Sequence, residues 1–144
     1  MFGGYYLIIY ADMVADLFHR GHVEFLKKIR SIYLDCYFIV GTHSDKDCTS
    51  YKRKPFFCME DRAEILMSCK YIDKVIKNAP LKITKEFIDK HKINIVVHGT
   101  DMNDFLKNEC YKIPIDLGIM KLVDYYEKIS TTSIIDSIRK RITI

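Results

Sequence analysis

The feature that most constrains this fold is an apolar segment that passes into a polar loop and then into a helical pattern. Residues 5–11 are almost all apolar or aromatic and alternate poorly, as in a central strand of a parallel sheet that is buried on both faces. From His22 onward, apolar residues recur at helical spacing between charged ones. Residues 12–22 should therefore follow the carboxyl end of a buried strand, where open α/β sheets bind ligands.

The same alternation of apolar runs and helical patterns continues along the chain. It predicts strands at 35–41, 74–76, 93–99 and 119–123, and helices at 59–69, 84–91 and from 130 onward. The basic, polar segment 47–57 is predicted to be irregular, either a solvated connector or a phosphate-binding loop, and 105–118 receives no assignment. The pattern indicates an α/β, Rossmann-like single domain over 1–144, with an open, mostly parallel five-stranded sheet and helices on both faces.

Composition narrows the functional class. With 144 residues, 49% of them hydrophobic, the chain can fill one core of ordinary size. Five cysteines without close pairing and the lack of a signal peptide favour a cytoplasmic protein. No apolar run approaches the roughly twenty residues of a membrane-spanning helix, so an integral membrane protein is not expected. The net charge of +4 suits anionic nucleotides, and without an RNA-stacking motif we expect no nucleic-acid partner.

Two histidines separated by Arg20 and Gly21 lie at the predicted start of the first helix. His19 and His22 could be solvated polar residues or metal ligands, but no further ligands follow at zinc-site spacing, so no metal site made of protein side chains is predicted. Gly21 would let the backbone approach a bulky ligand. Free N–H groups at a helix start favour phosphate, so the residues point to an anion site.

The segment His19-Arg20-Gly21-His22 resembles the HxGH signature of the nucleotidyltransferases, and residues 10–19 look like the cytidylyltransferase branch. Further blocks resemble that family in its order along the chain, at 52–55, 60–62, 69–75, 97–99 and 129–135. The chain is thus similar to the phosphoethanolamine and phosphocholine cytidylyltransferases of phospholipid biosynthesis.

The resemblance implies direct in-line transfer: a phospho-alcohol attacks the α-phosphorus of CTP and pyrophosphate leaves. His19 and His22 are the implied catalytic residues, together with Lys52 or Lys54. Counting back from Arg62 favours Lys52, whereas some family members would align Lys54, so both are kept. Mg²⁺ bound with CTP is the implied cofactor. A homodimer is implied as well, because the block at 71–73 lies at subunit contacts in the family.

The resemblance also assigns binding residues. The implied nucleotide-binding residues are Ala11, Asp12, Met13, Val14, Gly21, His98, Gly99, Thr100, Ile129, Ser130, Thr131 and Thr132. The candidates for the phospho-alcohol are Asp12, Asp16, Asp101 and Tyr111. By plainer interpretations, Ser130 is an ordinary helix N-cap and Asp101 a solvated turn residue.

The nature of the alcohol is a separate question. Choline recognition relies on aromatic faces, but the chain has no tryptophan, and Leu81 stands where the phosphocholine enzymes have an aromatic residue. Phosphoethanolamine is therefore the preferred substrate, although ten tyrosines leave a choline cage open.

Four positions depart from the family pattern. Met13 replaces a glycine and Ala15 an aromatic residue, while Tyr125 and Lys128 stand where an arginine and a glycine are usual. These changes leave two alternatives open: a CTP-binding subunit with little catalysis, and a nucleotidyltransferase that uses ATP or another phospho-substrate.

Overall fold

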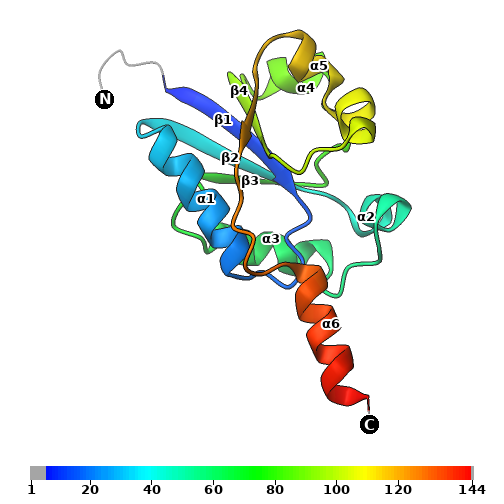
Figure 1. Ribbon diagram of the computed structural model, residues 1–144. Coiled ribbons are helices and arrows are strands. Elements are labelled where there is room, and N and C mark those ends of the chain that lie inside the picture. The colour runs from blue at the N-terminus through cyan, green and yellow to red at the C-terminus, as the bar shows by residue number, and fades with distance from the viewer. Residues whose placement is uncertain (1–5, 144) are drawn as a thin grey trace.

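The computed structural model describes residues 6–143, so Tyr5, the predicted first residue of a strand, lies outside the described part. Within it, five strands form one sheet: β1 (Leu7–Met13), β2 (Cys36–Thr42), β3 (Lys74–Lys77), β4 (Ile95–Gly99) and β5 (Met120–Val123). Their order is β3-β2-β1-β4-β5, and every neighbouring pair is parallel (Figure 1). The predicted α/β fold with a five-stranded parallel sheet is confirmed.

The helical segments in the described part are α1 (Arg20–Ile32), α2 (Asp45–Tyr51), α3 (Met59–Met67), α4 (Lys85–Lys90), the π-helical turn η1 (Leu106–Cys110), α5 (Lys112–Asp116) and α6 (Thr131–Ile142). No helix among these combines the length and the apolar character that crossing a bilayer requires.

The prediction of an irregular segment at 47–57 is wrong for its first residues, which belong to α2. Ser44 caps this helix by accepting the N–H of Asp47 at 3.0 Å. Asp45 and Asp47 place negative charge in its first turn, which favours helix formation despite the polar composition. The unassigned segment 105–118 contains η1 and α5.

Strand β1 is the centre of the molecule and is buried on both faces, as predicted. Its alternate residues belong to two different cores. One contains Ile9 and Ala11 with residues of α1 and α3, namely Leu26, Ile29 and Leu66. The other contains Tyr10 with Ile88 of α4, Cys110 of η1 and Tyr111, which follows η1. Helices therefore cover both faces of the sheet.

The topology determines where a ligand can bind. Strand β1 pairs with β2 on one side and with β4 on the other, so the strand order changes direction at β1. In open α/β sheets, a crevice forms at this point, outside the carboxyl ends of the strands. Helix α6 starts near this edge and extends away from the sheet, and Ile135 is its buried residue in the described chain (Figure 1).

Candidate active site

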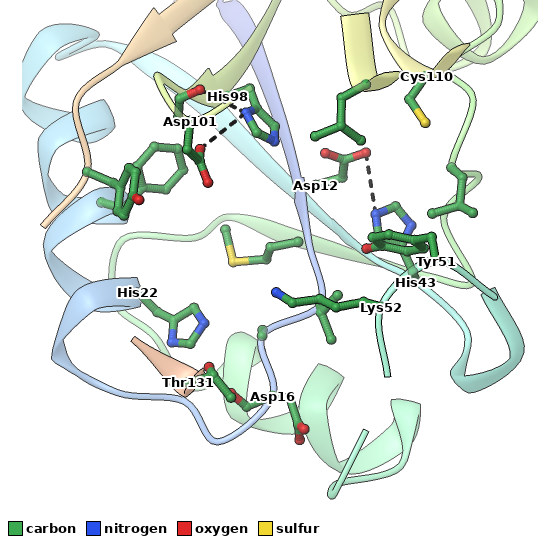
Figure 2. Close-up of a pocket in the computed structure, with 18 of the residues that line it drawn as sticks. Asp12, Asp16, His22, His43, Tyr51, Lys52, His98, Asp101, Cys110 and Thr131 are labelled. Carbon is green, nitrogen blue, oxygen red and sulfur yellow. Dashed lines mark hydrogen bonds and ion pairs between the residues drawn. The ribbon is translucent and has the colours of Figure 1, made fainter. Parts of the chain in front are cut away.

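A cavity of about 440 Å³ lies at the carboxyl edge of β1 and β4 (Figure 2). Most of the predicted site residues line it: Asp12, Met13, Val14, Asp16, Gly21, His22, Lys52, His98, Gly99, Asp101, Tyr111 and Thr131. Of the other predicted residues, all within the described part, Ala11, His19, Lys54, Thr100, Ile129, Ser130 and Thr132 do not line the cavity itself.

The two histidines form a reciprocal cap at the start of α1. The Gly21 N–H donates to Nδ1 of His19 at 2.9 Å, and the His19 N–H donates to Nδ1 of His22 at 3.1 Å. Because each Nδ1 accepts a hydrogen bond, each neutral ring carries its proton on Nε2. The ring centroids are 4.1 Å apart, so the cap presents two neighbouring Nε2–H donors.

Both rings are held in the neutral form. Burial lowers the pKa of His22 to about 4, with smaller contributions from His19 and Lys52, and burial also lowers the pKa of His19. Near neutral pH these side chains are therefore hydrogen-bond donors without a charge. The positive charge at the cavity comes from other residues.

Gly21 is required by the packing of the histidine cap. A Cβ at this position would lie 2.6 Å from Cε1 of His19 and 3.0 Å from the carbonyl oxygen of Ile129. The predicted reason for the glycine was close approach to a ligand. The structure adds another reason, which is room for the His19 imidazole.

The basic run 52–54 contributes two cations to the cavity. Lys52 lines it and Lys54 does not, which favours the first of the two lysines that the sequence left open (Figure 2). Burial and the neighbouring Arg53 lower the pKa of Lys52. Arg53, which was not predicted, also lines the cavity and donates from Nη1 to Oγ1 of Thr132 at 3.5 Å. The basic run was visible in the sequence, but the direction of each side chain was not.

Asp16 fixes the loop that carries these cations. Its Oδ2 accepts the Phe56 N–H at 2.8 Å and its Oδ1 accepts the Phe57 N–H at 2.9 Å. Its carbonyl accepts the hydroxyl of Thr131 at 3.1 Å. Asp16 thus ties the loop after β1 to the basic loop and to the start of α6, and its contact with substrate stays a prediction.

Ser130 is a helix N-cap, as its plainer interpretation predicts. Its hydroxyl accepts the Ser133 N–H at 3.0 Å, and Oγ of Ser133 accepts the Ser130 N–H at 2.9 Å. The first N–H groups of a helix have no partner within it. The start of α6, with Thr131 on the cavity wall, therefore offers donors suited to an anion.

Asp12, also on the cavity wall, contacts polar side chains from two other segments. The Tyr111 hydroxyl donates to Oδ1 of Asp12 at 2.5 Å. Burial and the Asp12 carboxylate raise the pKa of Tyr111, which keeps this hydroxyl protonated. Nε2 of His43 lies 3.5 Å from Oδ2 of Asp12 (Figure 2). His43 was not predicted, because its position after β2 carries no motif.

Three of the four positions that depart from the family pattern line the cavity, namely Met13, Ala15 and Tyr125. A Cβ on Gly99 would meet the Tyr125 ring at 3.2 Å. The ammonium of Lys128 lies 6.0 Å from the ring centroid of Tyr126, and Lys128 is not among the described residues that line the cavity. Among residues 6–143, no group of three or more His, Cys, Asp or Glu side chains could hold a metal ion.

The fold and the cavity define an α/β protein whose cavity, lined by Lys52 and Arg53, lies at the switch point of its sheet. The cytidylyltransferase-like family model matches residues 10–137, and the chain belongs to this family.

The curated relatives include enzymes for both alcohols. The chain is 40% identical over 136 residues to the ethanolamine-phosphate cytidylyltransferase of Dictyostelium discoideum, covering 91% of this chain and 37% of that protein. It is 37% identical over 134 residues to the Arabidopsis thaliana enzyme of the same name, covering 89% and 31%. It is 33% identical over 131 residues to choline-phosphate cytidylyltransferase A of Mus musculus, covering 90% and 36%. The chain thus spans less than half the length of these relatives.

Solved structures share the fold. The lipopolysaccharide core biosynthesis protein from Thermoplasma volcanium superposes with a TM-score of 0.68 at 22% identity, covering 84% of this chain and 98% of that one. Pantothenate synthetase from Thermus thermophilus superposes with a TM-score of 0.51 at 12% identity, covering 93% and 64%.

Proposed function

We propose that this chain is a CTP-dependent cytidylyltransferase that converts phosphoethanolamine and CTP to CDP-ethanolamine and pyrophosphate. One observation carries the proposal: the cap pairs two neutral imidazoles, with His22 on the wall of the cavity that Lys52 also lines and His19 directly beside it. Phosphocholine is the alternative substrate.

The reaction needs no protein nucleophile. A phosphate oxygen of phosphoethanolamine attacks the α-phosphorus of CTP, the new P–O bond forms, and the bond to pyrophosphate breaks. The protein aligns the two anions and stabilises the charge that builds on the oxygens around phosphorus. His19 and His22 supply preorganised donors for this charge, and one such donor typically contributes about 3 to 4 kcal/mol.

Cations and helix N–H groups support the triphosphate. Lys52 and Arg53 both line the cavity, and Arg53 reaches the start of α6 through Thr132. A guanidinium can bind a phosphate through two parallel hydrogen bonds. The Mg²⁺ implied by the resemblance would arrive with CTP, since this ion binds mainly through phosphate oxygens and few carboxylates. The separate acidic residues of the cavity fit that mode of binding.

The carboxylate of Asp12 supports an ammonium-bearing substrate. It is 8% exposed, lines the cavity and is oriented by Tyr111. The position of Leu81 on the cavity wall leaves an aliphatic side chain where a choline cage would use an aromatic ring. The carboxylate would attract either ammonium by charge, and the leucine favours phosphoethanolamine over phosphocholine.

The direct test measures pyrophosphate and the CDP-alcohol from CTP and Mg²⁺ with phosphoethanolamine or phosphocholine, and with ATP replacing CTP. His19→Ala and His22→Ala should each lower turnover by about two to three decades, the effect of removing one such donor. Full activity in both variants would reject the mechanism, and a clear preference for phosphocholine would reverse the order of substrates.

A second candidate function is a nucleotide-binding subunit with little catalysis. It is favoured by Met13 on the cavity wall and by Lys128, whose charge does not line the cavity within the described chain. Thermal shifts with CTP and ATP separate the candidates, because bound ligand stabilises the folded state. A shift with CTP but no product would support this second function.

We also propose that the protein is a homodimer in the cytosol. Exposed apolar side chains follow one another from the end of α1 to the start of β2, where Ile32 is 50%, Leu34 78% and Tyr37 38% exposed. Exposed apolar patches often mark interfaces between proteins. The five cysteines are free thiols, which suits a reducing compartment. Sedimentation of the wild type and Leu34→Asp tests the dimer, which the charge should dissociate.

A further inference from the structure

We infer that His43 determines the specificity of this site, by forming with Asp12 a pair of acceptors that holds a primary ammonium and not a quaternary one. The inference rests on the proposed function, because it concerns the alcohol half of the same substrate.

The ring of His43 has a fixed orientation. It is 4% exposed and follows β2, and its Nδ1 lies 3.0 Å from the carbonyl oxygen of Ala79. A carbonyl oxygen can only accept, so Nδ1 must carry a proton. In the tautomer that carries its proton on Nδ1, Nε2 presents a lone pair toward Asp12.

That lone pair faces a second acceptor. Nε2 of His43 lies 3.5 Å from Oδ2 of Asp12, and this oxygen has no hydrogen-bond partner within residues 6–143. Oδ1 of the same carboxylate already accepts the Tyr111 hydroxyl. Buried carboxylate oxygens are normally hydrogen-bonded, so two facing acceptors call for a donor between them (Figure 2).

A primary ammonium is such a donor. Its nitrogen can lie about 2.8 Å from both acceptors and direct one N–H to each, which is the ordinary distance for a charge-assisted hydrogen bond. A quaternary ammonium has no N–H, and its methyl groups keep the nitrogen farther away. Asp12 attracts either cation by charge, whereas a lone pair on Nε2 of His43 stabilises only a cation that donates a hydrogen bond. His43 is therefore the residue that discriminates.

The test uses phosphoethanolamine and its N-methyl, N,N-dimethyl and N,N,N-trimethyl derivatives, which carry three, two, one and no N–H donors. Bridging two acceptors needs two donors, so wild-type kcat/KM should fall most sharply between the N-methyl and the N,N-dimethyl compounds. His43→Leu should raise KM for phosphoethanolamine about tenfold or more, as expected when a hydrogen bond to a charged group is lost. In this variant KM for the trimethyl compound and for CTP should stay nearly unchanged, so the four compounds should differ less in kcat/KM.

His43→Gln keeps an acceptor of similar reach and should retain most of the discrimination. His91→Leu, which changes the histidine that ends α4 outside the cavity lining, is the matched control and should leave the series unchanged. Thermal unfolding shows whether each variant is folded. An equal loss for all four compounds in His43→Leu, or no loss for phosphoethanolamine, would overturn the inference and leave the proposed reaction intact.

If the wild type turns over none of the compounds, the proposed function fails. Calorimetric measurement of phosphoethanolamine binding then tests whether His43 helps to bind the ammonium. Binding that is lost in His43→Leu and kept in His43→Gln supports the two-acceptor site. Equal binding to wild type and variant, or no binding to the wild type, overturns it.

Discussion

Nη1 of Arg62 donates to the carbonyl oxygen of Val14 at 2.7 Å, which ties helix α3 to the loop that follows β1. This loop needs stabilising contacts from outside it, because its backbone is strained. Ala15 and Leu17 adopt left-handed backbone conformations, with φ of +57° and +49°. Each such non-glycine residue costs about 1 kcal/mol or more and persists only where the surroundings enforce it. The site loop is thus held in shape by a residue that does not line the cavity.

Replacement of Arg62 should therefore destabilise the whole protein. Its guanidinium is fully buried and also donates to the carbonyl oxygens of Phe57 and His43 and to the side chains of Thr42 and Asp45. Arg62→Leu leaves these acceptors unpaired, at about 1 to 3 kcal/mol each for the buried ones. Urea unfolding should show a loss of at least about 3 kcal/mol.

The matched control for this prediction is Arg20→Leu. Arg20 is exposed and forms a 3.5 Å ion pair with Glu24 and a contact with the Tyr126 ring, 5.1 Å from its centroid, so its loss should cost about 1 kcal/mol or less. Equal stability of the two variants would show that the buried guanidinium does not hold the loops.

A methyl group on Gly21 should damage catalysis more than folding. Gly21→Ala places its Cβ against the His19 ring, which must turn out of its cap. We expect turnover to fall about a hundredfold, as when one preorganised donor is lost. In a His19→Ala background the same change should have a much smaller effect, because the ring is absent and only the contact with the carbonyl oxygen of Ile129 remains. Additive losses in this double-mutant cycle would contradict the explanation.

Much of the fold could be predicted because its signals are local. Strand β1 is an apolar run, the start of α1 carries paired histidines, and Ser130 precedes α6 as a cap residue. The identity of Arg53 and His43 as site residues could not be predicted, because it depends on contacts between distant segments. His43 is oriented by the Ala79 carbonyl, and Arg53 by Thr132.

Errors in the predicted elements also have physical causes. The polar composition of 47–57 favoured a loop, but the Ser44 cap and the acidic first turn stabilise α2. In the segment 105–118, η1 is a π-helical turn in which the Tyr111 N–H donates to the carbonyl oxygen of Leu106 at 2.9 Å. The spacing of a π-helix shifts apolar residues out of the α-helical period, so the pattern gave no assignment.

The two lysines of the basic loop should differ in function. Lys52→Ala removes a cation that lines the cavity, whereas Lys54→Ala removes one that does not. We expect Lys52→Ala to lower kcat/KM for CTP by about tenfold or more and Lys54→Ala by less than about twofold, given that hydrogen bonds to charged groups contribute more than surface charges. Steady-state kinetics with CTP varied measures both. A larger effect at Lys54 would reverse the assignment.

Arg53→Lys tests whether the planar guanidinium matters as well as the charge. Arg53 lines the cavity and contacts Thr132 at the start of α6. Lysine keeps the charge but cannot bind a phosphate through a two-pronged contact. We expect KM for CTP to rise in Arg53→Lys, and to rise further in Arg53→Leu. Equal values in wild type and Arg53→Lys would show that charge alone is sufficient.

The neutral state of His22 predicts how stability depends on pH. Its pKa is lowered from 6.5 to about 4 in the folded protein, mainly by burial, so between these values the unfolded chain binds more protons. The contribution of neutral His22 is present above about pH 6.5 and is lost as the pH falls toward about 4, below which the loss levels off. At 1.36 kcal/mol for each pH unit, the full loss amounts to about 3 kcal/mol. Urea unfolding of the wild type and His22→Asn over this range isolates the effect, because the other titrating groups are common to both proteins. The wild type should lose this much stability relative to the variant, and parallel pH curves would show that His22 is not held neutral by the fold.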